Sequence, residues 1–293
     1  MGDNLTPRAE RQPCKELDLN MLRLLMAMGF LVWSGLPQTA LAHEYWIAAQ
    51  KFQVEAGEAV VADLLVGSMM SGEAYPWLKR SAKEAKLWAP DGNAVDITGR
   101  EGDLPALNVT PEEPGLNRIS FHTQPSYVVF EEFAKFQAYL DLEGLTGVAE
   151  AHRARGLPEE DFIEEFTRNA RALIQVGPVV DGESDTPTGM PYELVAVGNP
   201  FTPGLTEIAV QLTWNGVPAA GVQVALFLTP PGVTPPEGVE RTLFTTDAEG
   251  RVTVPLDRAG RYMLASVHIE PLDAGTAAVW KSHWANLTFA LSR

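Results

Sequence analysis

The stretch Ile208-Ala209-Val210-Gln211-Leu212-Thr213-Trp214, followed by Asn215-Gly216, decides the fold class of this 293-residue chain. Apolar and polar residues alternate through it, as they do in a strand with one buried face. Asn-Gly is the dipeptide that most strongly favours a two-residue hairpin turn. The sequence therefore predicts a β-hairpin here.

Short strands of the same kind continue towards the C-terminus. Residues 222–228, 251–254, 260–269 and 283–291 are rich in apolar and β-branched positions and are separated by turn residues. Evenly spaced short strands are typical of a sandwich of two sheets. We therefore expect residues 192–293 to form a C-terminal β-sandwich that is immunoglobulin-like or transthyretin-like.

The region before this domain divides into a β part and a helical part. Residues 43–128 alternate short strands with turns, which predicts an N-terminal β domain. Residues 129–176 are expected to be helical, and residues 177–191 are Gly/Pro-rich and typical of a linker or exposed loop. The whole chain is thus predicted to be mostly β, with two β-sandwich lobes and a two-helix insertion between them.

Two helices are expected in residues 129–176. Residues 130–140 place apolar side chains at close to a 3.6-residue period, and Gly144 is a suitable stop. A second helix is predicted to begin near Pro158, because proline is favoured in a first helical turn. Its buried stripe would consist of Phe162, Phe166, Ala170 and Leu173.

The N-terminus has the pattern of a secretory signal. An apolar run over residues 24–36 follows Arg23, and small residues stand at Ala40 and Ala42. Residues 21–42 therefore read as a signal peptide, cleaved after Ala42. The run is too short for a membrane-spanning helix, which needs about 20 apolar residues. We expect a periplasmic protein that does not span the membrane after cleavage, with residues 1–20 as a non-native extension.

Composition narrows the possible functions. The formal net charge of −16 opposes binding to phosphate backbones, so we expect no nucleic-acid partner. The only cysteine, Cys14, precedes the predicted cleavage site, which leaves no disulfide or thiolate chemistry in the exported chain. No Gly-x-Ser-x-Gly elbow or glycine-rich phosphate loop is present, so the sequence does not indicate an enzyme.

Cleavage after Ala42 would expose a metal-chelating group. His43 would become the first residue, and its free amine and Nδ1 can close a six-membered ring on a metal ion. Imidazole and amine nitrogens suit nickel, cobalt and copper ions. Further candidate metal ligands are His268, His283, His122 and Glu44, of which we rank His268 above His283. Each of them is also compatible with an ordinary structural role.

Several motifs resemble one family of exported bacterial proteins. The matching segments are His43-Glu44-Tyr45-Trp46, residues 136–140 with Glu143-Gly144-Leu145, residues 168–177, Gly260-Arg261-Tyr262 and residues 284–289. That family is of unknown function or is described as the periplasmic component of a cobalt/nickel uptake system. The resemblance implies a periplasmic, two-lobed, mostly β protein that handles divalent metal. His283 departs from the residue that the family is expected to have there.

Three functions follow as hypotheses. The first is a periplasmic metal-binding protein that captures Ni²⁺, Co²⁺ or Cu²⁺ through His43 and His268 and passes it to a membrane transporter. The second is a copper protein with a histidine-brace-like site, acting as a chaperone or an oxidase. The third is a metal-free β-sandwich module that binds carbohydrate or protein.

Overall fold

The hairpin predicted at Asn215-Gly216 is present in the computed structural model, which describes residues 44–273 and 275–292. Strand β12 (Glu207–Trp214) turns there into β13 (Val217–Pro218). Asn215 has φ 49° and Gly216 has φ 77°, and two positive φ angles are what a type I′ hairpin turn requires. The predicted hairpin is therefore confirmed.

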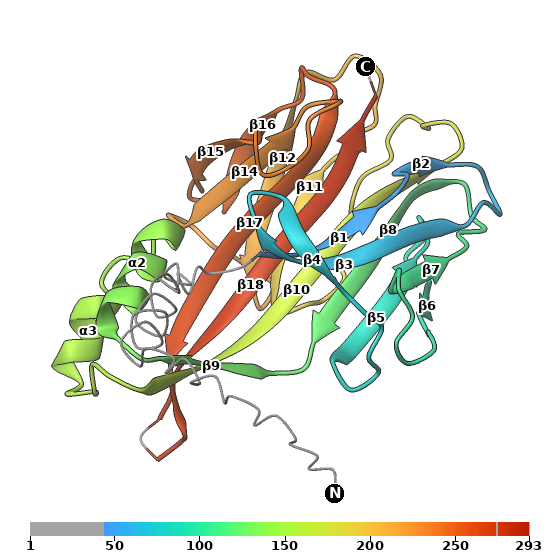
Figure 1. The fold of residues 1–293 in the computed structure, drawn as a ribbon. Coiled ribbons are helices and arrows are strands. Elements are labelled where there is room, and N and C mark those ends of the chain that lie inside the picture. The colour runs from blue at the N-terminus through green and yellow to red at the C-terminus, as the bar shows by residue number, and fades with distance from the viewer. Residues whose placement is uncertain (1–43, 274, 293) are drawn as a thin grey trace, which may run out of the picture. The chain divides into compact units, whose positions relative to one another are not determined.

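The largest sheet has ten strands and runs through most of the described chain (Figure 1). Its main path, in spatial order, is β15 (Glu240–Thr245), β14 (Gln223–Thr229), β17 (Gly260–Pro271), β18 (Ala278–Leu291), β10 (Phe162–Val176), β8 (Gly115–Thr123), β5 (Ala82–Trp88) and β6 (Ala94–Asp96). Two more strands, β2 (Gln53–Val54) and β9 (Ser126–Phe130), pair with β10. The mostly β prediction is confirmed.

Two smaller sheets lie on opposite faces of the ten-stranded sheet. One contains β1 (Glu44–Ala49), β3 (Val60–Ser68), β4 (Ser71–Tyr75) and β7 (Leu107–Val109), and the other contains β11 (Tyr192–Val197), β12, β13 and β16 (Arg251–Pro255). The Thr288 hydroxyl of β18 donates to the Ile47 carbonyl of β1 at 2.8 Å, whereas Ser266 of β17 lies 2.7 Å from the Tyr192 hydroxyl of β11. Neighbouring positions along a strand alternate between faces, so these contacts define the two faces.

The two predicted lobes share this sheet. Strand β10 pairs in parallel with β18 from the C-terminal region and antiparallel with β8 from the N-terminal region. The described residues belong to one compact unit. The sheets pack as in a sandwich, but the central sheet takes strands from both sides of the predicted domain boundaries.

The first predicted helix is present and the second is not. Helix α2 (Phe133–Glu143) ends at Gly144, which has φ 69°, and α3 (Val148–Ala154) follows it. The segment expected to be a helix from Pro158 is instead strand β10. Because β10 lies in the centre of the sheet and is covered on both faces, its apolar residues do not alternate strictly. Their four-residue spacing therefore resembled a helical stripe.

Residues 177–191 are not a free linker. Asp185, Thr188 and Met190 are buried, although the segment is rich in glycine, proline and polar residues. The Asp185 carboxylate accepts bonds of 2.9 and 2.7 Å from the Arg171 guanidinium of β10. This pair fixes the segment against the sheet. Among the described residues, no helix has the length and hydropathy needed to cross a membrane.

Candidate functional site

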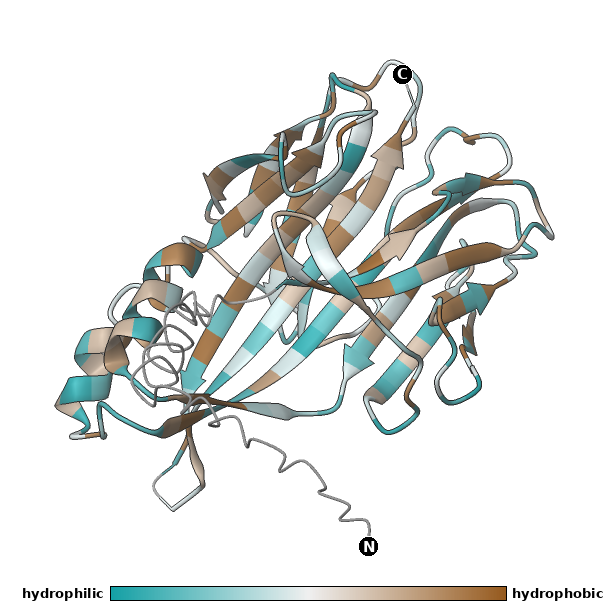
Figure 2. Ribbon diagram, in the orientation of Figure 1, coloured by the Kyte–Doolittle hydropathy of each residue, from teal (hydrophilic) through white to brown (hydrophobic). Residues whose placement is uncertain are grey.

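Polar side chains interrupt the central strands on the face that β1 covers. Figure 2 shows hydrophilic residues within β10 and β18 between hydrophobic ones. Glu164 and Arg168 come from β10, and Ser282 and Asn286 come from β18. Even-numbered positions of both strands share this face because side chains alternate. Ionisable groups in a sheet centre are costly and point to a function.

Glu44 is the first described residue of this region. The predicted cleavage site and His43 lie outside the described residues. Glu44 is 6% exposed, and its Oε2 has no hydrogen-bond partner among the described residues. Burial raises the pKa of Glu44 to about 7, although a backbone hydrogen bond and the charges of Arg241 and Arg168 oppose that rise. A buried carboxylate with a bare oxygen is stabilised by a proton or a bound cation.

Two further glutamates are buried in this region, and we call Glu44, Glu143 and Glu164 the acid cluster. Glu143 ends helix α2, and burial followed by the charge of Glu44 raises its pKa to about 8. Burial raises the pKa of Glu164 to about 7, against the effect of a hydrogen bond from the Ser282 hydroxyl. The Tyr139 hydroxyl donates to Glu164 at 3.5 Å. All three groups therefore hold protons more tightly than ordinary glutamates.

Two arginines supply positive charge to the acid cluster. Arg168 stacks between Phe166 and Trp284, with its guanidinium carbon 5.0 and 4.9 Å from the two ring centroids. Burial lowers the pKa of Arg168 to about 10, which leaves it charged at neutral pH. Arg241 donates to the Leu142 carbonyl at 3.0 Å. If all three carboxyls ionise, two guanidinium groups do not balance them.

Unpartnered atoms also lie deeper on this face of the sheet. Glu164 Oε2 and both polar side-chain atoms of Asn286 are buried without a hydrogen bond to any residue in the described part of the chain. Asn286 is 1% exposed. Buried polar atoms nearly always have partners. Glu164 pairs with Trp280 and Asn286 lies opposite Ala170, six positions further along β10, so these atoms do not form one site.

The described residues do not by themselves provide a complete metal site. Within 44–273 and 275–292, no group of three or more His, Cys, Asp or Glu side chains is arranged to hold a metal ion. The three carboxylates of the acid cluster are therefore not arranged as one metal site, and a ligand set that includes Glu44 would need groups outside the described residues.

The histidines at 268 and 283 lie on the opposite face of the sheet from Glu44. They face each other across β17 and β18, with ring centroids 6.3 Å apart, and both rings contact Trp214 of β12 at 4.4 and 4.5 Å. His283 bonds Thr167 through Nδ1 at 3.0 Å and Glu270 through Nε2 at 3.2 Å. The sheet thus brings His268 and His283 together but separates them from Glu44.

His122 lies on this same face. It pairs with Glu84 of β5, and its pKa is lowered to about 4 by burial and then by the charge of Lys83. Burial also lowers the pKa values of His268 and His283, so all three imidazoles are neutral at pH 7. The contacts of these three histidines are those of structural residues. A neutral imidazole can still bind a metal ion, so their protonation state does not exclude that role.

Sequence reasoning missed Glu143, Glu164 and Arg168. Glu164 and Arg168 lie in the segment after Pro158 that the apolar spacing predicts to be a helix, where charged residues between the buried positions are ordinary. In a strand, Glu164 and Arg168 share a face with Phe162 and Phe166. Alternating charged and aromatic residues would have been the available signal. The sequence around Glu143 carries no such signal, because a charged residue beside Gly144 is ordinary at a helix end.

Comparisons with known proteins identify a family of unknown function. No curated protein matches the chain. The D0–D1 domain of intimin is similar at 12% identity, with 83% of this chain and 96% of that chain covered and a TM-score of 0.21. A family model described as a domain of unknown function, DUF4198, matches residues 40–270. The chain therefore belongs to the DUF4198 family.

Proposed function

We propose that this protein is an exported, periplasmic binding protein for a divalent transition-metal ion, and that it assists nickel or cobalt uptake by a membrane transporter. The ion would be chelated by the amine and Nδ1 of His43 after cleavage behind Ala42, with the Glu44 carboxylate as an oxygen ligand. His268 is left out of this ligand set because the sheet separates it from Glu44.

The proposal rests on one observation: Glu44 Oε2 is buried and has no hydrogen-bond partner among the described residues. Glu44 directly follows the proposed chelating residue, is buried, and has its pKa raised to about 7. A divalent cation beside Glu44 would remove the cost of ionising this carboxyl and would offset the charge of Glu143, which interacts with Glu44. The negative net charge of the chain also favours a cationic cargo.

Calorimetric titration of the cleaved protein with Ni²⁺ and Co²⁺ tests this function. A protein that begins at His43 is expected to bind either ion. Glu44→Gln and an added N-terminal methionine should each weaken binding by about tenfold or more, because each removes one ligand. His268→Gln is the matched control, since it removes an imidazole from the opposite sheet face, and it should leave the affinity unchanged.

Two outcomes would reject the proposal. Equal affinity in the cleaved, methionine-extended and Glu44→Gln proteins would show that the start of the chain does not bind the ion. Loss of binding in His268→Gln alone would move the site to the other face. Cu²⁺ binds most tightly to nearly any such site, so the cargo is identified by the metal retained on protein isolated from the periplasm.

A further inference from the structure

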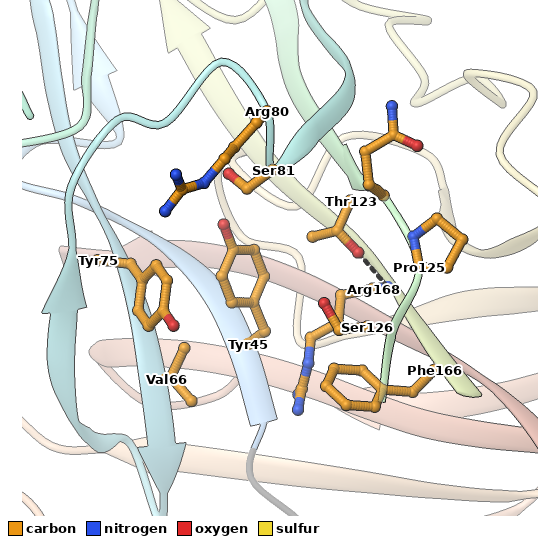
Figure 3. A pocket seen from close by; sticks show the side chains of 11 residues that line it. Tyr45, Val66, Tyr75, Arg80, Ser81, Thr123, Pro125, Ser126, Phe166 and Arg168 are labelled. Atoms are coloured by element: carbon orange, nitrogen blue, oxygen red, sulfur yellow. Dashed lines mark hydrogen bonds between the residues drawn. The ribbon is translucent and has the colours of Figure 1, made fainter. Parts of the chain in front are cut away.

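A pocket opens beside β1, between Tyr45 and the β10 residues Phe166 and Arg168. It has a volume of about 330 Å³, at the small end of the range for ligand sites. Figure 3 shows the side chains of Tyr45, Tyr75, Arg80 and Arg168 around this space. They come from β1, β4, the loop before β5, and β10, so segments distant in sequence build one pocket.

Two arginines line the pocket although the protein is acidic. Arg80 and Arg168 line it, and its lining contains no aspartate or glutamate. The chain as a whole has a net charge of −16. The Arg80 side chain makes no ion pair or hydrogen bond with any described residue, so its donors remain available to a ligand. Guanidinium groups match the geometry of a carboxylate or phosphate with two parallel hydrogen bonds.

Aromatic side chains and hydroxyl groups form the rest of the lining. Tyr45, Tyr75 and Phe166 provide ring surfaces, and Ser81 and Ser126 provide hydroxyl groups. Tyr75 is 47% exposed, whereas Tyr45 is only 5% exposed. The Tyr45 ring packs on the Phe121 ring, with 5.9 Å between the two centroids. A fixed inner ring and an accessible outer ring suit a flat ligand body better than a small inorganic ion.

We propose that this pocket binds a small organic anion that carries a carboxylate on a planar ring. The carboxylate would bind the Arg80 guanidinium near Ser81, and the ring would lie against Tyr75 and Tyr45. This site goes beyond the proposed metal function. Arg168 lines the pocket and its charge also acts on Glu44 and Glu164, so the variants that test the pocket leave Arg168 unchanged.

Titration of the cleaved protein with 4-hydroxybenzoate, in the presence of a metal chelator, tests the site. We expect saturable binding, measured as the heat released or absorbed in calorimetry. The neutral amide 4-hydroxybenzamide should bind about tenfold more weakly or not at all, because it lacks the charge that Arg80 recognises. Inorganic phosphate should bind more weakly than 4-hydroxybenzoate, because it has no ring to stack.

Arg80→Gln is the decisive variant, and Lys79→Gln is its matched control. Both residues are exposed neighbours, but only Arg80 lines the pocket. Arg80→Gln should weaken 4-hydroxybenzoate binding by about tenfold, and Tyr75→Ala should also weaken it, whereas Lys79→Gln should not. The proposal would be overturned if Arg80→Gln and Lys79→Gln lost the same affinity for 4-hydroxybenzoate. It would also be overturned if 4-hydroxybenzamide bound as tightly as 4-hydroxybenzoate, or if phosphate bound more tightly. The absence of saturable binding would overturn it too. None of these results bears on the metal titration.

Discussion

Arg171→Met is expected to destabilise the protein by about 3–5 kcal/mol, the usual loss when one member of a buried ion pair is removed. The Arg171 side chain is fully buried in β10, and its guanidinium pairs with Asp185 at 2.7 Å and with Glu193 at 3.1 Å. It also donates to the Thr186 carbonyl at 2.8 Å. Methionine would leave two carboxylates buried without their cation. Urea unfolding at pH 7 measures the loss.

Arg258→Met serves as the control for Arg171→Met. Arg258 also pairs with a carboxylate, that of Glu240 at 2.6 Å, but both side chains are about half exposed. Exposed pairs contribute little, so this variant should lose far less stability than Arg171→Met. Similar small losses in the two variants would mean that the 177–191 segment is not fixed through Arg171.

Glu143→Gln is expected to stabilise the metal-free protein at pH 8 and to have little effect at pH 4.5. The pKa of Glu143 is about 8 in the folded protein, against an ordinary value of 4.5. The folded state therefore retains this proton while the unfolded state releases it. The contribution of Glu143 to stability is complete below pH 4.5 and is lost as the pH rises to about 8. Glutamine stays neutral throughout, and the gain at pH 8 should be on the order of 3 kcal/mol.

The measurement is the difference in unfolding free energy between Glu143→Gln and the unchanged protein at several pH values, with a chelator present. Comparing the two proteins at each pH removes the opposite contribution of His122, whose lowered pKa destabilises the fold as the pH falls from 6.5 to about 4. Glu131→Gln is the control, because Lys135 lowers the pKa of this exposed carboxyl and no gain is expected. A difference that does not grow with pH would contradict the buried acid cluster.

Turns and helix ends were predicted correctly where they depend only on residues close together in sequence. The Asn215-Gly216 turn and the end of α2 at Gly144 depend on residues that are neighbours in sequence, and both occur where expected. Strand β10 was mistaken for a helix because its identity depends on pairing with β18, more than a hundred residues later. No local period encodes such a partner, and tertiary pairing overrides the local preference.

The candidate site was predictable only in part, for the same reason. Glu44 could be named from the sequence, because it follows the residue that cleavage would expose. Burial of Glu143 and Glu164 could not, because it is created by the packing of α2 and β1 over the ten-stranded sheet. The sequence also could not show that His268 and His283 face away from Glu44, because that follows from the register of β17 and β18.

By itself, the sequence determined a mostly β chain with a helix ending at Gly144 and the pattern of an export signal before His43. The tertiary structure alone decided that one sheet joins both halves, that residues 177–191 are fixed by Arg171, and which ionisable groups meet on each face. The physical reason is that hydrophobic periodicity and turn chemistry act between near neighbours. Burial and pKa shifts instead depend on which distant strands and helices pack together.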